Sequence, residues 1–301
     1  MSERTAVEIG TETVVATRKR VSQFSEAWSR MKRSKSAMVG LIIMIILILI
    51  AIFADVLVDY EVDCVTPDLA NRLQVPSREH ILGTDAFGRD VLARIIYGTR
   101  ISLVVAFSSV TLSLVIGAML GSIAGFYGGK IENIIMRITD VFAAIPNLLM
   151  AITIATALGQ SIFSMIVAIG IAGVPALARI VRATVLTVKD QDFVEAGRAL
   201  GGNNMQIILF HLLPNCIAPI IVQSTLRVAG AILSTSSLCF LGIGIKPPTP
   251  EWGNMLAGGR DFLRTAQHIT LYPGLAIVIT ILAINLMGDG LRDALDPKLR
   301  R

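Results

Sequence analysis

The composition of this 301-residue chain excludes a soluble globular protein. Hydrophobic residues make up 53% of the chain and charged residues only 16%, whereas an average soluble domain has about 25% charged residues. The net charge of +5 does not indicate a nucleic-acid partner, because the Lys and Arg residues lie mainly at the chain ends and between the apolar stretches, where membrane topology requires them. Several uncharged stretches exceed the roughly 18–20 residues that a helix needs to cross a bilayer, so the sequence predicts an all-α, polytopic membrane protein.

The first predicted transmembrane helix covers residues 37–58. A cleaved signal peptide would place an apolar region of roughly 7–15 residues close to the N-terminus, whereas here 36 mostly polar residues precede a longer run, so we expect an uncleaved anchor. Residues 1–36 are predicted to form a cytoplasmic segment in which Phe24, Trp28 and Met31 share one helical face. This segment is either a helix lying in the membrane interface or a basic flank that only sets the topology.

Residues 59–100 are predicted to form an extracytoplasmic loop. Five more spans follow it, within a core at residues 101–291. No charged residue lies between Asp140 and Arg179. That stretch is too long for one crossing, so we expect two spans there, separated by a turn at residues 159–161. The five spans are residues 101–126, 141–158, 162–178, 215–238 and 269–288, which makes six transmembrane helices with the first.

The distribution of Lys and Arg predicts that both termini face the cytoplasm. With this orientation 18 of these residues lie on the cytoplasmic side, including those of a C-terminal tail at residues 292–301, and 8 lie on the other side. This asymmetry follows the positive-inside rule. The chain is therefore expected to be a multi-pass protein of the plasma (inner) membrane.

Two glycine-containing patterns have competing interpretations. Gly117, Gly121 and Gly125 recur every four residues, a spacing that lets helices approach closely in lipid; we expect packing within the chain, and contact with a second subunit is the alternative. The string GFYGGK that follows is similar to a phosphate-binding loop, but such a loop requires Gly and Ser or Thr where this chain has Ala124 and Ile131. The three Cys and three His residues are scattered and match no metal-ligand spacing. The sequence therefore predicts no catalytic, cofactor-binding or metal-binding residue in this chain.

Arg227 lies about 12 residues, or roughly 18 Å, into the fifth predicted span. An arginine at that depth almost always faces the interior of the protein or a water-filled cavity. We predict Gln223, Arg227 and Asn285 as candidates for a translocation path, in which Arg227 could bind the carboxylate of a substrate. For Arg227 the alternative is structural: it is tied to backbone carbonyls or to a partner subunit. Asn147 and Asn285 are weaker candidates of the same kind, for which hydrogen bonds between helices are the alternative.

A cytoplasmic loop at residues 190–214 has the pattern of a mechanical connection between two spans. Its first part, from Asp192 to Leu200, is predicted to form a short helix that stops at the glycine pair beginning with Gly201. A second amphipathic stretch then leads through Pro214 into the fifth span. Because the short helix lies between two spans, a force applied to it from the cytoplasm would reach both.

This loop resembles the EAA loop of ABC-importer permeases, whose pattern is EAA, three residues, Gly, nine residues and then I-x-LP. Gly197 departs from the second Ala of the pattern, and His211 stands where Ile is usual. His at that place, in HLLPN, is itself similar to the peptide-importer branch. The residues that match in register are Glu195, Ala196, Gly201, Leu213 and Pro214.

Three other blocks resemble the C-type permease subunit of dipeptide and oligopeptide ABC importers. They read HILGTDAFGRDVLARIIYGTRISL (residues 80–103), FLGIGIKPPTPEWGNMLAGGR (240–260) and NLMGDGLRDALDPKLR (285–300). The likeness runs from about Trp28 to the C-terminus. It implies the type I ABC importer permease fold, with a permease core at residues 101–291.

The resemblance also implies partners for this chain in the lipid bilayer. A B-type permease subunit would form a heterodimer with it, two ABC ATPase subunits would bind ATP and Mg, and an extracytoplasmic peptide-binding protein would deliver the substrate. The short helix of the 190–214 loop would seat in one ATPase. The residues expected to couple to the ATPases are Asp192, Glu195, Ala196, Gly197, Leu200, Gly201 and Pro214.

The implied function is a permease subunit that moves dipeptides or oligopeptides into the cell, with energy from ATP hydrolysis by separate ATPase subunits. A nickel or glutathione importer is the alternative within the same class, because relatives with those substrates share the same blocks. An intramembrane enzyme would need His, Asp, Ser or Cys residues that converge at one depth, and no such set can be assembled. A passive channel or scaffold would have no use for the EAA-like loop.

Overall fold

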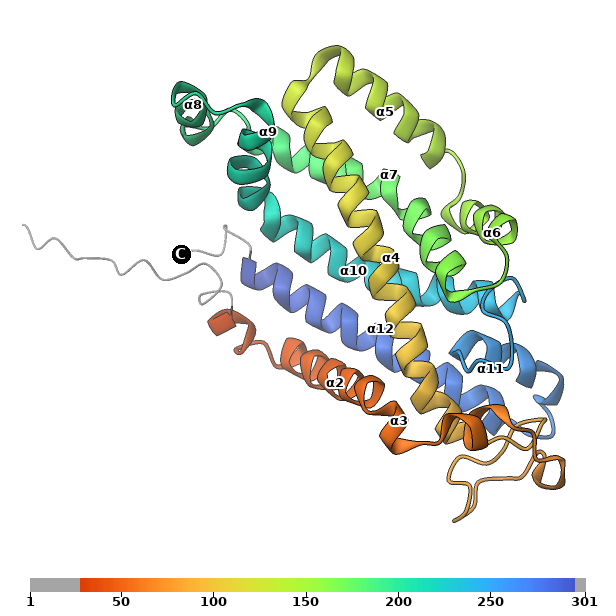
Figure 1. The fold of residues 1–301 in the computed structure, drawn as a ribbon. Helices are drawn as coiled ribbons and strands as arrows, with labels where there is room; N and C mark the ends of the chain where they lie inside the picture. Colours follow the sequence, from red (N-terminus) through yellow and green to blue (C-terminus); the bar gives the residue numbers. More distant parts are fainter. Residues whose placement is uncertain (1–27, 296–301) are drawn as a thin grey trace, which may run out of the picture.

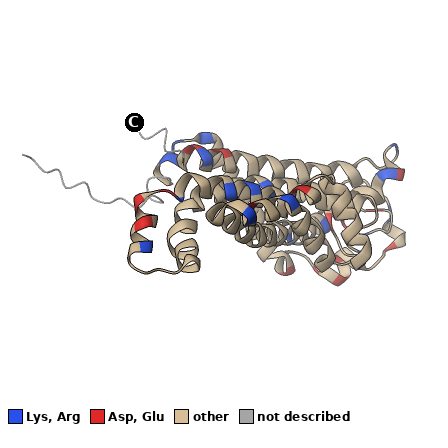
Figure 2. Cartoon of the chain, turned by 90° about the horizontal axis from the view of Figure 1, so that it is seen from above, with Lys and Arg blue, Asp and Glu red and all other residues tan. Residues whose placement is uncertain are grey.

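A computed structural model describes residues 28–295, and its regular elements are helices. Five of them are long and apolar enough to cross a membrane, and Figure 1 shows that they extend along the molecule. They are α2 (Lys35–Ile52), α4 (Val91–Tyr127), α7 (Ile162–Val188), α10 (Leu213–Phe240) and α12 (His268–Leu295). Figure 2 shows the charged residues mostly at the two ends and on a few of the turns between them. The all-α membrane fold is therefore confirmed.

The span predicted at residues 141–158 is wrong as a single helix. The structure has two helices there, α5 (Gly129–Ala143) and α6 (Asn147–Leu158), which meet at 85° across a short break. Pro146 stands directly before α6; proline lacks the N–H that a continuing helix needs, and it disfavours helical geometry in the residue before it. The described residues thus hold five continuous helices that could span a membrane, and six spans if the bent pair is counted as one.

Ion pairs hold α5 against α7. The Arg182 Nε donates to Glu132 Oε1 at 2.6 Å, and Arg179 lies 3.3 Å from Asp140. Much of the opposite face of α5 is apolar and exposed, as at Ile134. The helix is therefore amphipathic, which explains why its residues did not read as part of a long apolar span.

The first span is shorter than the predicted 37–58, because α2 ends at Ile52. Arg100, on α4, donates to the carbonyl oxygens of Ala51 (2.9 Å) and Ile52 (3.2 Å). These are carbonyls that the last turn of a helix leaves without intrahelical partners. The end of α2 is thus set by a side chain from another helix. A second short helix, α3 (Ala54–Leu57), follows the break.

The other boundaries differ because helices continue into polar sequence beyond the apolar core of a span. α4 begins ten residues earlier than the predicted residue 101, so the preceding loop ends at residue 90. α7 continues past the predicted residue 178, and α12 includes residues 292–295 of the predicted tail. Hydrophobicity marks where a helix is in lipid, whereas the hydrogen-bonded helix itself extends further.

The N-terminal segment is described only from Trp28 onward. Residues 28–31 are helical. Met31 is buried beside Ala37 and Ala294, and Trp28 is exposed. Phe24 lies outside the described residues, so the interfacial helix stays a prediction.

The three glycines of α4 pack this helix against α7. A Cβ added at Gly121 would lie 2.4 Å from the carbonyl oxygen of Ala178, and at Gly117 it would lie 2.8 Å from the side chain of Leu177. A Cβ added at Gly125 would lie 2.8 Å from Cγ1 of Val185. The interpretation of the glycine spacing as packing within the chain is confirmed.

The end of the molecule formed by residues 59–90 and 241–267 contains four short elements. Its buried centre is Glu251, which caps α11 (Trp252–Gly259) by accepting from the Asn254 N–H at 3.0 Å. The other carboxyl oxygen of Glu251 accepts from the hydroxyls of Ser102 on α4 and Ser236 on α10, each at 3.3 Å. Burial raises the pKa of this carboxyl above its usual range. The elements at this end are η1 (Tyr60–Val65), η2 (Leu69–Asn71), α11 (Trp252–Gly259) and η4 (Arg260–Phe262).

We expect Glu251→Gln to stabilise the protein at neutral pH and to flatten the dependence of its stability on pH. Because the pKa of the Glu251 carboxyl is higher in the folded state than in the unfolded chain (about 4.3), the free energy of unfolding is highest below the unfolded pKa and falls as pH rises through the folded pKa. Glutamine keeps a side chain of the same shape without the charge. The measurement is the thermal unfolding midpoint of both proteins in detergent, from weakly acidic to weakly alkaline pH. A variant that is less stable than the wild type at neutral pH would contradict this account.

Candidate functional site

The short helix predicted after the fourth span is present as α8 (Asp192–Ala199). It projects from one end of the molecule, next to α9 (Asn204–Gln206) (Figure 1). The next segment, η3 (Ile207–Leu212), continues directly into α10. We call α8, α9 and η3 together the coupling segment.

Gly201 ends the short helix, as the sequence indicates. Its φ of +83° is a left-handed conformation that glycine adopts without strain. The Gly201 N–H donates to the carbonyl of Arg198 at 2.9 Å, and the Gly202 N–H donates to the carbonyl of Gly197 at 3.1 Å. These two bonds use carbonyls that the end of a helix otherwise leaves unpaired.

One face of α8 packs inward on η3. Val194 and Gly197 are buried there, and a Cβ added at Gly197 would lie 2.9 Å from Cδ2 of His211. The two departures from the EAA pattern therefore contact each other. Because Gly197 lies on this inner face, the structure does not place it where a partner protein could touch it, unlike the other predicted coupling residues of α8.

The opposite face of the coupling segment is exposed. Leu200 is the extreme case, with 89% of its surface accessible, and Pro214 is exposed at the start of α10. Three further apolar residues are exposed here that sequence reasoning did not single out, namely Met205, Leu209 and Phe210. The amphipathic pattern after Gly202 predicts that these residues share one helix face. It does not predict that this face is exposed to solvent. The predicted coupling residues found on the exposed surface are Asp192, Glu195, Ala196, Leu200, Gly201 and Pro214.

A buried apolar cluster connects the coupling segment to three spans. Val194 of α8 and Ile207 of η3 belong to the same cluster as Phe126 of α4, Val185 of α7 and Cys216 of α10. Close-packed protein interiors have low compressibility and transmit strain. The cluster therefore offers a route by which a displacement of α8 would reach the adjacent ends of α4, α7 and α10.

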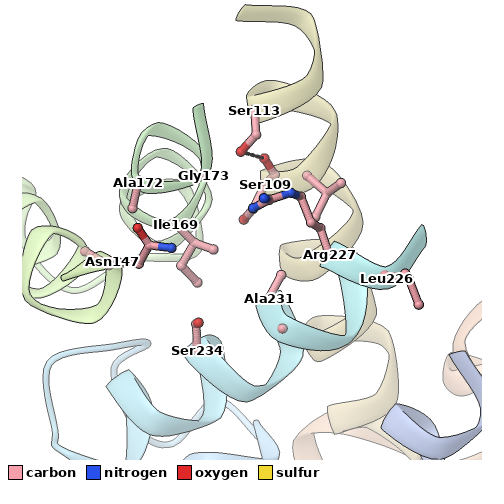
Figure 3. A pocket seen from close by; sticks show the side chains of 13 residues that line it. Ser109, Ser113, Asn147, Ile169, Ala172, Gly173, Leu226, Arg227, Ala231 and Ser234 are labelled. Carbon is pink, nitrogen blue, oxygen red and sulfur yellow. Dashed lines mark hydrogen bonds between the residues drawn. The ribbon is translucent and has the colours of Figure 1, made fainter. Parts of the chain in front are cut away.

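A second feature is a partly open cavity of about 260 Å³ around Arg227, lined by residues of α4, α6, α7 and α10. Figure 3 shows the Arg227 side chain reaching toward Ser109 on α4, while Asn147 and Ser234 point into the same space. The Nε atom of Arg227 is buried without a hydrogen-bond partner. The lining residues are Ser109, Val110, Ser113, Asn147, Ala151, Ile169, Ala172, Gly173, Leu226, Arg227, Gly230, Ala231 and Ser234.

The structure brings together only part of the set predicted for a translocation path. Arg227 and Asn147 line the cavity, whereas Gln223 and Asn285, although half-buried, do not. Gln223 lies one turn before Arg227 on α10, and Asn285 lies on α12, which is not among the helices around the cavity. The serines were missed because serine is common in membrane helices, although Ser109 and Ser113 continue the four-residue spacing of the glycines in the same helix.

The chain matches two models of protein families. Residues 117–301 match the model described as binding-protein-dependent transport system inner membrane component. Residues 22–76 match the N-terminal TM domain of oligopeptide transport permease C. The two matches together cover both ends of the described structure.

Full-length relatives are similar along almost the whole chain. The dipeptide transport system permease protein DppC of Alkalihalophilus pseudofirmus is 48% identical, covering 93% of this chain and 91% of that protein. The di/tripeptide transport system permease protein DppC of Pseudomonas aeruginosa is 42% identical over 93% of each chain. The glutathione transport system permease protein GsiD of Escherichia coli is 43% identical, covering 91% of this chain and 90% of that protein.

Solved structures show the same fold at low sequence identity. A chain of the inward-facing MetNI methionine ABC transporter has a TM-score of 0.56 and 19% identity, covering 67% of this chain and 96% of that one. A chain of an amino acid ABC transporter has a TM-score of 0.52 and 16% identity, covering 67% of this chain and 94% of that one. The helices described above thus have the type I arrangement of ABC importer permeases.

Proposed function

The chain belongs to the family of binding-protein-dependent transport system inner membrane components, and from this premise we propose that it is the C-type permease subunit of an ABC importer for dipeptides or oligopeptides. The observation that carries the proposal is 48% identity to a dipeptide permease along 93% of the chain. The exposed coupling segment is consistent with it, since a permease driven by separate ATPases needs a surface for them.

We infer an assembly in which this chain is one of several subunits. A homologous B-type permease completes the pathway, two ATPase subunits bind ATP and Mg below, and an extracytoplasmic binding protein delivers the peptide. The sequence supports separate ATPase subunits because the string GFYGGK lacks the residues of a phosphate-binding loop. The Lys and Arg distribution supports an orientation with the coupling segment in the cytoplasm.

Coupling in this assembly is mechanical. The exposed face of α8, with Glu195, Ala196 and Leu200, seats in a groove of one ATPase, and the buried cluster behind it passes the movement to α4, α7 and α10. A ligand shifts a conformational equilibrium only by its difference in affinity for the two states. ATP and the loaded binding protein therefore favour different conformations of the permease.

The second candidate substrate is glutathione, which is favoured by the 43% identity to GsiD. The complex is purified together with its binding protein from its native membrane through a tag on this chain, reconstituted in vesicles with ATP, and supplied with radiolabelled alanyl-alanine, trialanine or glutathione. We expect ATP-dependent uptake of the alanine peptides, and co-purification of a second permease and ATPases. Uptake of glutathione alone would reassign the substrate. A chain that purifies without partners and supports no uptake would contradict the proposed function.

A further inference from the structure

The cavity around Arg227 contains a positive charge that no described residue balances. The Nε atom of Arg227 is buried without a partner, and no ion pair to Arg227 occurs within residues 28–295. None of the described residues that line the cavity is Asp or Glu. An uncompensated cation within a membrane span is costly and marks a functional site by default. The cavity therefore favours an anionic occupant.

The broken span adds a second positive feature at the same place. Asn147, which lines the cavity, is the first residue of α6, and no side chain caps that end of the helix. The first N–H groups of a helix lack intrahelical partners and carry partial positive charge. In membrane transporters, helix starts of this kind face anionic groups of the substrate near the middle of the bilayer. The 85° break between α5 and α6 creates such a helix start inside the membrane.

The hydrogen bonds of the lining show which groups are free to bind an anion. Ser109 donates to the carbonyl of Val105 at 2.6 Å, and Ser113 donates to the carbonyl of Gly170 at 2.5 Å. The remaining donors at the cavity are the guanidinium of Arg227, the amide of Asn147 and the hydroxyl of Ser234. Arg227 is near the middle of α10, about 21 Å along the axis from its first residue.

We propose that this cavity receives the C-terminal carboxylate of the peptide as it crosses the membrane, with Arg227 as the cation and the start of α6 as the second positive group. This inference rests on the proposed function, because the peptide supplies the carboxylate. The cavity is smaller than the roughly 300–1,000 Å³ of a complete ligand site. It therefore holds the carboxylate end, and the rest of the peptide extends outside it.

The anion preference of the cavity is tested with thiol reagents of opposite charge. Ser234→Cys is introduced in the assembled complex, where the native cysteines are buried in this chain, and labelling is followed by mass spectrometry of the intact chain. The measured quantity is the labelling rate of anionic sulfonatoethyl methanethiosulfonate divided by that of the cationic trimethylammonium reagent. We expect this ratio to be about tenfold higher in Ser234→Cys than in the Ser234→Cys/Arg227→Gln double variant. Arg227→Lys in the same background keeps the charge and the preference. Equal ratios of the two labelling rates in the Ser234→Cys single variant and in the Arg227→Gln double variant would overturn the proposal.

Peptide protection and uptake identify the anion. We expect alanyl-alanine to slow the anionic labelling of Ser234→Cys and its C-terminal amide to leave it unchanged; equal protection by both would overturn the carboxylate assignment. Arg227→Gln alone should lower alanyl-alanine uptake at least about tenfold. Normal uptake by this variant, together with loss of the reagent preference, would place the anion site off the path and overturn the proposal. If the wild-type complex takes up no peptide, the proposed function fails, and the reagent ratio still reports the anion preference.

Discussion

Replacing Leu200 with aspartate is expected to lower peptide uptake by the complex severely while its ATPase subunits continue to hydrolyse ATP. Leu200 is 89% exposed at the end of α8, so the substitution removes almost no packing within this chain. In the proposed assembly the side chain is covered by an ATPase, and a carboxylate buried there without a cation is strongly unfavourable. Because the loss of one apolar anchor at the centre of an interface typically weakens binding severalfold to a thousandfold, uptake per ATP hydrolysed should fall at least about tenfold.

The measurement is radiolabelled alanyl-alanine uptake and phosphate release by the same vesicles. Leu200→Met is the matched control: it keeps an apolar side chain of similar volume and should retain uptake within about a factor of two. The amount of each variant in the purified complex shows whether the chain has folded. An aspartate variant with the wild-type ratio of uptake to hydrolysis would remove the end of α8 from the coupling mechanism.

The second large effect is expected from Gly121→Ala, which should destabilise the fold. The added Cβ would lie 2.4 Å from the carbonyl oxygen of Ala178 and 2.8 Å from Cβ of Val181. A flexible side chain can change its rotamer to avoid such a clash, but backbone atoms of a helix cannot. The helices α4 and α7 must therefore move apart where they are in contact. Overpacking of this kind costs about 1–3 kcal/mol. The thermal unfolding midpoint of the purified protein and its yield from the membrane should both fall.

Gly230→Ala provides the comparison in another span. Nothing lies within 4 Å of a Cβ added at Gly230, and alanine favours a helix by about 1 kcal/mol over glycine. Its unfolding midpoint should equal or exceed that of the wild type. If both glycine variants lost the same stability, the close approach of α4 and α7 would not be the reason that residue 121 is glycine.

Sequence reasoning located the apolar parts of the spans well and their ends poorly. The start of α7 at Ile162 and the end of α8 near Leu200 are as predicted, because Ser161 and Gly201 are local signals for a helix start and a helix stop. The end of α2 was missed because it depends on Arg100, which is distant in sequence. The break before α6 was missed although Pro146 was visible, since hydropathy averaged over the stretch hid it.

The two candidate sites differ in how far the sequence could predict them. The coupling segment is built from consecutive residues, so its pattern was readable, but the inward position of Gly197 against His211 was not. Arg227 itself could be identified from the sequence, because a charged side chain deep in a membrane span is energetically costly. Its neighbours come from four helices, and Gln223, although only one turn away, does not line the cavity.

The sequence by itself determined that the protein spans a membrane, which family it resembles, and that one arginine lies within a span. Composition, local patterns and the cost of burying charge are properties that each segment carries alone. The tertiary structure decided which helices approach most closely, where a side chain ends another helix, and which polar groups share the cavity with Arg227. These depend on contacts between residues far apart in the chain, whose geometry is set only when the helices pack.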